Sequence, residues 1–226
     1  MWPGMFNQEE PFQTFDGAIQ ACNQSLKFLQ VDEIDLYLIH NPFAKENRLE
    51  LWEAMVELKK QGKVKHIGVS NYNINHIQEI EKAGIEMPAA NQIEIHPWHV
   101  VSKSLAEYMD KNEILPIAYS TLAPIPNWRE GSRWNGKPED MKSGAMPCED
   151  IANKYAVTVP QLFLKWAIQL GYPVLPKSVK YDRLKENLSL DHFEISIDDM
   201  TSISNIAIDN QKCLAWSGDF DPLEVD

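Results

Sequence analysis

The chain has 226 residues, of which 44% are hydrophobic and seven are tryptophan. A chain of this length and composition can bury one sizeable core, so we expect a single folded domain over residues 1–226. The formal net charge of −12 argues against general binding to nucleic acid or to anionic membranes, because both require a positive field facing phosphate groups.

The cysteines and the start of the chain bear on the cellular compartment. Cys22, Cys148 and Cys213 are odd in number and widely spaced, so we interpret them as reduced thiols of a cytoplasmic protein. No histidine outside His40 has a ligand-like companion in the sequence, and no metal site is predicted. Met1–Gly4 lacks the features of a signal peptide, and no stretch approaches the length of a membrane span.

Short apolar runs alternate with longer segments of helical period along the chain. The predicted helices have apolar residues every three or four positions, and Gly62 and Ser102 mark helix boundaries. This repeated β/α order predicts a parallel sheet, either a doubly wound open sheet or a (β/α)8 barrel. The predicted strands are 34–40, 64–69, 89–95, 114–120 and 172–176, and the predicted helices are 15–29, 48–60, 73–82, 103–112, 158–170 and 182–188.

The ends of the predicted strands hold polar side chains that a packed core would not need. In either architecture the carboxyl ends of parallel strands form one rim, where ligands bind. A histidine, carboxamides, a flat aromatic ring and a cation would meet there and could hold a phosphorylated cofactor with a ring. Taken singly, each of these side chains has an ordinary structural explanation, for example a core amide with satisfied hydrogen bonds. The rim residues are His40, Ser70, Asn71, Asn91, Gln92, Tyr119, Ser120 and Lys177.

The segment 174–187 is the most informative in the chain. A short apolar run ends in Lys177, a hydroxyl residue follows, and Arg183 and Glu186 lie three apart on a predicted helix. A buried strand that delivers a lysine to the first turn of a helix, with an arginine nearby, is typical of a phosphate site. A strand, a turn and a surface helix with solvated charges remain the alternative.

Five motifs together resemble the aldo-keto reductase family, in family order and spacing, from about residue 14 to the C-terminus. They are 36–42 (LYLIHNP), 67–72 (IGVSNY), 91–97 (NQIEIHP), 118–120 (AYS) and the segment 174–187. The resemblance implies a (β/α)8 TIM barrel that binds NADPH and transfers hydride to the carbonyl of a small aldehyde or ketone. His40 would orient and polarise that carbonyl.

The resemblance also implies which residues hold NADPH. Ser70, Asn71 and Gln92 would hold the nicotinamide carboxamide, and Tyr119 would stack on the nicotinamide ring. Ser120 and Leu122 would line the pyrophosphate path. The adenosine 2′-phosphate and adenine would contact a further set, in which Lys177 and Arg183 select NADPH over NADH: Lys177, Ser178, Val179, Arg183, Glu186 and Asn187.

Three of the four catalytic residues of the family have no counterpart in this chain. The family uses an Asp, a Tyr that donates the proton, a Lys and the His, and only His40 matches. Trp2–Gly4 resembles the segment that follows the family's Lys, so we expect an incomplete barrel that lacks roughly its first three strands. Because a general acid contributes about 100- to 10,000-fold, we expect this chain alone to be weakly active or inactive. Tyr37 and Tyr72 are not obvious substitutes for that acid.

Other functions stay open at this point. A non-catalytic NADP(H)-binding or interaction protein, and a non-functional fragment, are the alternatives to a reductase. An incomplete barrel would expose flat strand edges, so self-association through them is expected. Residues 123–147 are rich in proline and glycine and read as a loop, which in the family folds over the cofactor pyrophosphate. Residues 207–226 correspond to the region that sets substrate choice in the family, so the substrate is not predicted.

Overall fold

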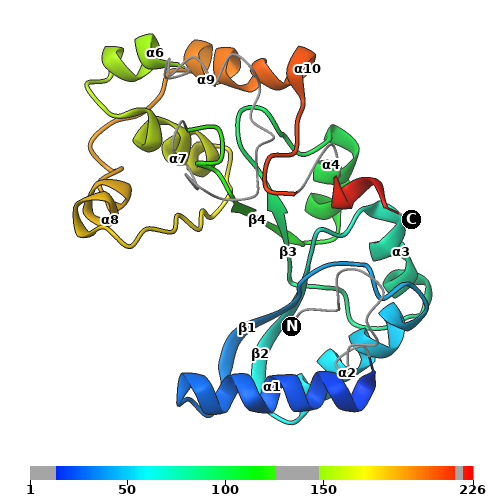
Figure 1. Ribbon diagram of the computed structural model, residues 1–226. Helices are drawn as coiled ribbons and strands as arrows, with labels where there is room; N and C mark the ends of the chain where they lie inside the picture. Colours follow the sequence, from blue (N-terminus) through cyan, green and yellow to red (C-terminus); the bar gives the residue numbers. More distant parts are fainter. Residues whose placement is uncertain (1–13, 126–147, 217–220, 226) are drawn as a thin grey trace. The chain divides into compact units, whose positions relative to one another are not determined.

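The computed structural model describes residues 14–125, 148–216 and 221–225 (Figure 1). The chain divides into two compact units, and each is described by itself. The first unit comprises Met1–Ile93, Lys103–Pro116 and Pro222–Asp226, and the second comprises Glu94–Ser102 and Ile117–Asp221. No helix in the described ranges is long and apolar enough to cross a membrane.

One four-stranded sheet has the order β1-β2-β3-β4, with parallel strands. The strands are β1 (Ile34–Ile39), β2 (Val64–Ser70), β3 (Ala90–Glu94) and β4 (Leu115–Tyr119). Ile34 pairs with Val64 in the first ladder, and Ser70 pairs with Gln92 in the second. Parallel neighbours need a crossover connection, and a helix lies between each pair of consecutive strands. The predicted β/α organisation with a parallel sheet is confirmed.

Side-chain caps mark the starts of two helices of the first unit. They are α1 (Phe15–Leu29), α2 (Arg48–Lys60), α3 (Ile74–Lys82) and α4 (Lys103–Lys111), with the short 3-10 turns η1 (Lys45–Asn47) and η2 (Pro222–Glu224). The Thr14 side chain accepts a hydrogen bond from the Gly17 amide at the start of α1. Asn73 and His76 form a reciprocal capping box at the start of α3.

The core of the first unit lies between the sheet and the inner face of α2. Leu51, Trp52, Met55 and Leu58 recur at helical spacing and are all buried. The Trp52 indole, though buried, donates its N–H to the Glu86 carbonyl at 2.7 Å, so its polar group is satisfied.

The second unit is mainly helical within its described residues. Its helices are α6 (Glu149–Lys154), α7 (Val159–Gln169), α8 (Tyr181–Leu188), α9 (Ile197–Ser204) and α10 (Ile206–Asn210). Helix α7 is buried over most of its length, and its Phe163 ring meets the Trp98 ring edge-on at 6.1 Å. A capping box between Thr158 and Gln161 fixes its start.

The prediction of a fifth strand, extended and buried over residues 172–176, was wrong. Only an isolated parallel bridge joins Val174 to Ala118, with hydrogen bonds from the Ala118 amide to the Pro173 carbonyl and from the Leu175 amide to the Ala118 carbonyl. Pro173 and Pro176 cannot donate hydrogen bonds to a ladder, and Leu175 is 51% exposed. Lys177 therefore follows a bridged segment and not a buried strand.

Candidate functional site

The ends of β2 and β3 place three of the predicted site residues together in the first unit. The Ser70 hydroxyl donates to the Gln92 carbonyl at 2.7 Å, and the Asn71 amide donates to the same carbonyl at 3.0 Å. Ser70 and Asn71 are nearly fully buried, and Gln92 is half-buried. The two hydrogen bonds fix the backbone at the point where β2 ends.

Asn71 extends this cluster to β1. Its side-chain amide donates to the His40 carbonyl and to the Ser70 hydroxyl, both at 3.0 Å. Its backbone has a φ of +63°, a left-handed conformation that asparagine tolerates better than most residues. The structure thus places His40, Ser70, Asn71 and Gln92 at one edge of the sheet, as predicted for the carboxyl ends of parallel strands.

His40 follows β1 and is partly buried. Burial disfavours the charged imidazolium and lowers the pKa of His40 to about 4, so the ring is neutral near pH 7. Its Nδ1 lies 3.3 Å from the Asn41 side-chain nitrogen. A neutral imidazole can offer one N–H to an oxygen of a substrate without bringing a charge to it.

Asn91 has the structural role that was considered for it. Its side chain donates to the Tyr72 carbonyl at 2.7 Å and accepts from the Tyr72 amide at 3.3 Å. Burial raises the pKa of the Tyr72 phenol, and it also raises the pKa of the Tyr37 phenol. Both phenols are buried, so neither is an accessible proton donor.

Tyr119 ends β4 in the second unit. Its hydroxyl accepts a hydrogen bond from the Trp216 indole N–H at 2.8 Å, and burial raises its pKa well above the ordinary value. Ser120 follows with a φ of +55°, and the carbonyls of Ser120 and Leu122 accept the amides of Ala123 and Ile125 in consecutive tight turns. The chain therefore turns sharply at this strand end. Of the predicted loop, residues 126–147 lie outside the described residues.

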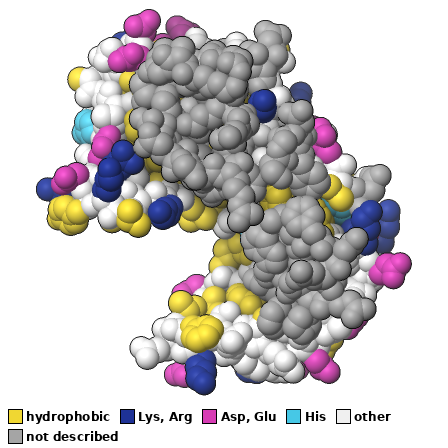
Figure 2. Space-filling model, viewed as in Figure 1, with side chains coloured by type: hydrophobic (Ala, Val, Ile, Leu, Met, Phe, Trp, Pro, Cys, Tyr) yellow, Lys and Arg dark blue, Asp and Glu magenta, His cyan; other side chains and the backbone are white. Residues whose placement is uncertain are grey.

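The segment before α8 carries exposed cations. Lys177 lies ahead of the helix and Arg183 lies in its first turn, and both are exposed. Where Figure 1 places α8, Figure 2 shows Lys and Arg side chains beside hydrophobic ones. Val179, which precedes the helix, is 83% exposed. Lys180, the cap residue, provides no side-chain hydrogen bond to the helix. The first amides of α8 can thus face an anion.

The other predicted residues of this segment differ in exposure. The Ser178 hydroxyl accepts the Lys180 amide at 3.1 Å and shapes the turn into α8. The Glu186 carboxylate accepts a hydrogen bond from the Thr158 hydroxyl, so part of its hydrogen-bonding capacity is used within the protein. Asn187 is buried at 7% exposure.

Comparison with known proteins agrees with this arrangement. The sequence model of the Aldo/keto reductase family matches residues 11–208. The chain belongs to the aldo/keto reductase family. It is 33% identical over 207 residues to the glyoxal reductase of Bacillus subtilis (strain 168), which covers 92% of this chain and 68% of that protein.

Solved structures of this family share the fold. The aldo-keto reductase MGS-M4, from a Medee basin deep-sea metagenome library, superposes with a TM-score of 0.78 at 31% identity, over 100% of this chain and 75% of its own. A mutant of Gox0644 in complex with NADPH gives a TM-score of 0.78 at 32% identity, over 97% and 73%. The family fold is a TIM barrel, and the four parallel strands described in this chain correspond to part of one.

This aldo/keto reductase chain is shorter than its relatives. It spans 61% to 68% of the length of four curated relatives that it matches, the glyoxal reductase among them.

Sequence reasoning missed the role of Glu94 in the second unit. The Glu94 carboxylate, 1% exposed, accepts hydrogen bonds from the amides of Leu214 and Ala215, at 2.6 and 2.9 Å, and from the His96 ring at 2.8 Å. Burial alone would raise the pKa of Glu94, but the hydrogen bond and charge of His96, together with His99 and the Cys213 thiol, outweigh it and the pKa is lowered. A buried ionised carboxylate therefore holds the segment that carries Trp216. The only local signal was a glutamate inside an apolar strand.

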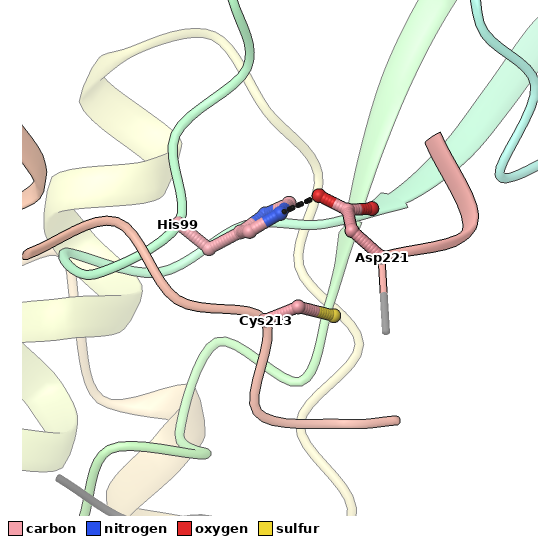
Figure 3. Close-up of side chains that lie close together, drawn as sticks. All are labelled: His99, Cys213 and Asp221. Carbon is pink, nitrogen blue, oxygen red and sulfur yellow. Dashed lines mark hydrogen bonds and ion pairs between the residues drawn. The ribbon is translucent and has the colours of Figure 1, made fainter. Parts of the chain in front are cut away.

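The expectation that His99 has no ligand-like companion was also wrong. Its Nε2 lies 2.8 Å from the Asp221 carboxylate, and the Cys213 thiol lies close to both (Figure 3). Burial alone would lower the pKa of His99, but the hydrogen bond and charge of Asp221 outweigh it and the pKa is raised. Residues more than a hundred positions apart form this cluster, so spacing could not reveal it.

Proposed function

We propose that this chain binds NADPH and acts as a carbonyl reductase of the aldo-keto reductase type. The observation that carries the proposal is the hydrogen-bonded cluster at the strand ends, in which Asn71 joins Ser70 to the backbone of His40. Asn71 has a left-handed backbone and a buried amide. A non-glycine residue with a left-handed backbone is often found at functional sites, where a side chain must be held in place.

The chemistry of the donor set in the first unit fits a nicotinamide carboxamide. A carboxamide has one acceptor oxygen and two N–H donors, so it pairs with side chains that both donate and accept. Ser70, Asn71 and Gln92 are side chains of this kind, and the backbone around them is fixed by hydrogen bonds. In the second unit, the flat ring of Tyr119 is held by Trp216 and would stack on the nicotinamide.

The side chains of the segment 177–187, in the second unit, suit the adenosine 2′-phosphate of NADPH. An adenosine 2′-phosphate carries a negative charge that NADH lacks, and Lys177 and Arg183 are exposed cations beside the first turn of α8. Ser178, Val179, Glu186 and Asn187 would contact the adenosine. Ser120 and Leu122, in the turns after β4, would contact the pyrophosphate.

His40 would hold the substrate. The neutral ring can donate one N–H to the carbonyl oxygen of an aldehyde or ketone, which polarises the carbonyl. NADPH, when bound, would supply the hydride to the carbonyl carbon. The substrate class is a small aldehyde or ketone, and the similarity to a glyoxal reductase favours an α-oxoaldehyde as the first compound to test.

Proton donation limits the rate that we expect from this chain by itself. Tyr37 and Tyr72 are buried phenols whose pKa is raised by burial, which makes them poor general acids. We therefore propose slow turnover, about 100- to 10,000-fold below that of a reductase with a positioned acid.

Reduction of glyoxal tests the proposal. The untagged chain is incubated with glyoxal and NADPH, and the alcohol product is quantified together with NADPH consumption. We expect slow, saturable formation of product in equal amount to the NADPH consumed, and a further loss of rate in His40→Gln. His192→Gln, at an exposed histidine, is the control. Absence of NADPH-dependent product after long incubation, by a chain shown to be folded, would refute the reductase proposal.

A further inference from the structure

Three side chains of metal-ligating type converge in the second unit. His99 lies in the segment after β3, whereas Cys213 and Asp221 lie near the end of the chain, and Figure 3 shows His99 and Asp221 facing each other with the Cys213 side chain beside them. Their ligating atoms lie within 4.8 Å of one another. His99 and Cys213 are buried, and the Asp221 side chain is 15% exposed, which gives solvent a route to the cluster.

The His99 ring is held in the orientation that a metal requires. Its Nδ1 lies 2.8 Å from the Glu94 carbonyl oxygen, which only accepts hydrogen bonds, so Nδ1 carries a proton. The opposite nitrogen, Nε2, therefore faces Asp221. A histidine that donates one ring N–H to a carbonyl and presents the other nitrogen is the usual arrangement of zinc-binding imidazoles.

The hydrogen-bond partners imply two protons at the centre of the cluster. One bridges His99 Nε2 and the Asp221 carboxylate, and the other is on Cys213, whose thiol donates to Glu94 Oε2 at 2.9 Å. Burial, together with the charges of Glu94 and Asp221, raises the pKa of this thiol. Glu94 and Asp221 bring two negative charges to a buried site, and His99 balances only one of them.

We propose that His99, Cys213 and Asp221 bind one zinc ion. Bonds form from zinc to His99 Nε2, Cys213 Sγ and one Asp221 oxygen, and the protons on Nε2 and Sγ leave to solvent. Two positive charges replace two protons, so the net charge of the buried cluster does not change. The mixture of imidazole, thiolate and carboxylate favours zinc over magnesium or calcium, which prefer oxygen ligands alone.

Small movements bring the three groups to zinc geometry. Zinc lies ~2.0–2.3 Å from N, O and S ligands, so in a tetrahedron the ligand atoms lie roughly 3.3–3.8 Å apart. The longest separation in the cluster must shorten by about 1 Å, and the 2.8 Å separation of His99 and Asp221 must open by a smaller amount. The fourth tetrahedral position is left to a water molecule.

Bound zinc would tie Cys213 and Asp221 to the segment after β3. Trp216, which donates to the Tyr119 hydroxyl, lies between the two C-terminal ligands. Zinc would therefore steady the contact between Trp216 and Tyr119. The inference concerns metal binding only, and it stands whether or not the chain reduces carbonyls.

Cobalt provides the spectroscopic test, because Co²⁺ replaces Zn²⁺ and reports a bound thiolate. The untagged full chain, reduced and freed of metal, is titrated with Co²⁺, and zinc is then added in competition. We expect one equivalent to bind with a sulfur-to-cobalt charge-transfer band that zinc abolishes. Cys213→Ser should lose this band, whereas Cys148→Ser, which alters a thiol elsewhere in the chain, should retain it.

Asp221→Asn is a second variant, which should remain folded because the Asp221 side chain is partly exposed. Its affinity for zinc should fall by at least ~10- to 100-fold, the loss typical of groups that only orient a metal ligand. Circular dichroism confirms that each variant is folded. A missing band in the wild-type chain, a band that persists in Cys213→Ser, or affinity unchanged in Asp221→Asn would overturn the proposal.

Discussion

The Asn71 side-chain amide donates to the His40 carbonyl at 3.0 Å and so joins the ends of two neighbouring strands. Asn71 has two features that a substitution can separate, its side chain and its left-handed backbone. Asn71→Gly removes only the side chain, since glycine adopts this backbone freely. Asn71→Ala removes the side chain and adds a strain of about 1–2 kcal/mol.

We therefore expect both Asn71 variants to bind NADPH more weakly than the wild type, and Asn71→Ala to be the less stable of the two. Fluorescence titration measures the binding, and urea unfolding measures the stability. Asn112→Ala is the matched control, because the Asn112 side chain donates to the Tyr108 carbonyl at the end of α4. Wild-type affinity in Asn71→Gly would show that the side chain does not act in the site.

The lowered pKa of His40 predicts how the stability of the chain depends on pH. Its pKa is about 4 in the folded chain and ~6.5 in an unfolded one, so between these values the unfolded state binds more protons. The free energy of unfolding should thus fall as the pH decreases from about 6.5 toward 4. His40→Gln removes this contribution, so its curve of stability against pH should be flatter in that range.

Urea unfolding at several pH values tests this expectation, with His192→Gln as the control at an exposed site. Parallel curves for the wild type and His40→Gln would contradict the neutral, partly buried imidazole. NMR of the ring protons gives a direct check, since the His40 signal should show no titration midpoint near 6.5.

Gly68 lies where the chain passes close to its neighbouring strands. A Cβ at this position would meet the Leu38 side chain at 2.6 Å and the Ala90 carbonyl oxygen at 2.7 Å. The backbone of β3 cannot move aside cheaply, so Gly68→Ala should cost about 1–3 kcal/mol by overpacking. It should also speed amide hydrogen exchange in β1, β2 and β3.

Gly62→Ala is the control for Gly68→Ala. Gly62 has a φ of +68° and open space around its Cα, so alanine would bring local strain without a clash. We expect lower stability but unchanged exchange in the strands. If Gly68→Ala left exchange in the strands at the wild-type rate, the close packing of β1, β2 and β3 would be contradicted.

Glu94→Gln should release the segment that carries Trp216. The neutral amide cannot replace an ionised carboxylate that accepts hydrogen bonds from two backbone amides, a ring N–H and a thiol. Loss of a buried charged partner typically costs about 3–5 kcal/mol. Faster hydrogen exchange at Leu214 and Ala215 and a lower denaturation midpoint are the expected results.

Glu86→Gln makes the same chemical change at the surface. The Glu86 carboxylate pairs with Lys59, and its side chain is 43% exposed, so the expected loss is only about 0–1 kcal/mol. Equal effects of the two substitutions would mean that Glu94 does not anchor the C-terminal segment.

The sequence predicted the bounds of an element correctly where the residues that determine those bounds lie within or beside it. Helices Phe15–Leu29 and Arg48–Lys60 have the predicted bounds at both ends, because their apolar spacing, and the Thr14 cap of the first helix, depend on neighbouring residues. The segment 172–176 was wrong because its apolar composition outweighed its two prolines, which cannot support a ladder. Helices α6 and α10 are short and were not predicted.

The candidate site likewise has residues that could be predicted from the sequence and contacts that could not. His40, Ser70, Asn71 and Gln92 could be predicted from the ends of apolar strands, because parallel strands bring their carboxyl ends to one edge. Cys213, Leu214 and Ala215, which donate to Glu94, lie 119 to 121 residues further along the chain, and no local pattern connects them to it. Such contacts depend on the tertiary fold, and they became visible only in the structure.

Selection of NADPH over NADH is proposed to depend on Lys177 and Arg183 in the segment 177–187. Its most direct test is a titration of the purified chain with NADPH and with NADH, followed by quenching of tryptophan fluorescence. The wild type should bind NADPH in the micromolar range or tighter and NADH more weakly. A Lys177→Ala and Arg183→Ala double variant should lose this preference, whereas Lys185→Ala should keep it. Equal binding of both cofactors by the wild type, or an unchanged preference in the double variant, would contradict the claim.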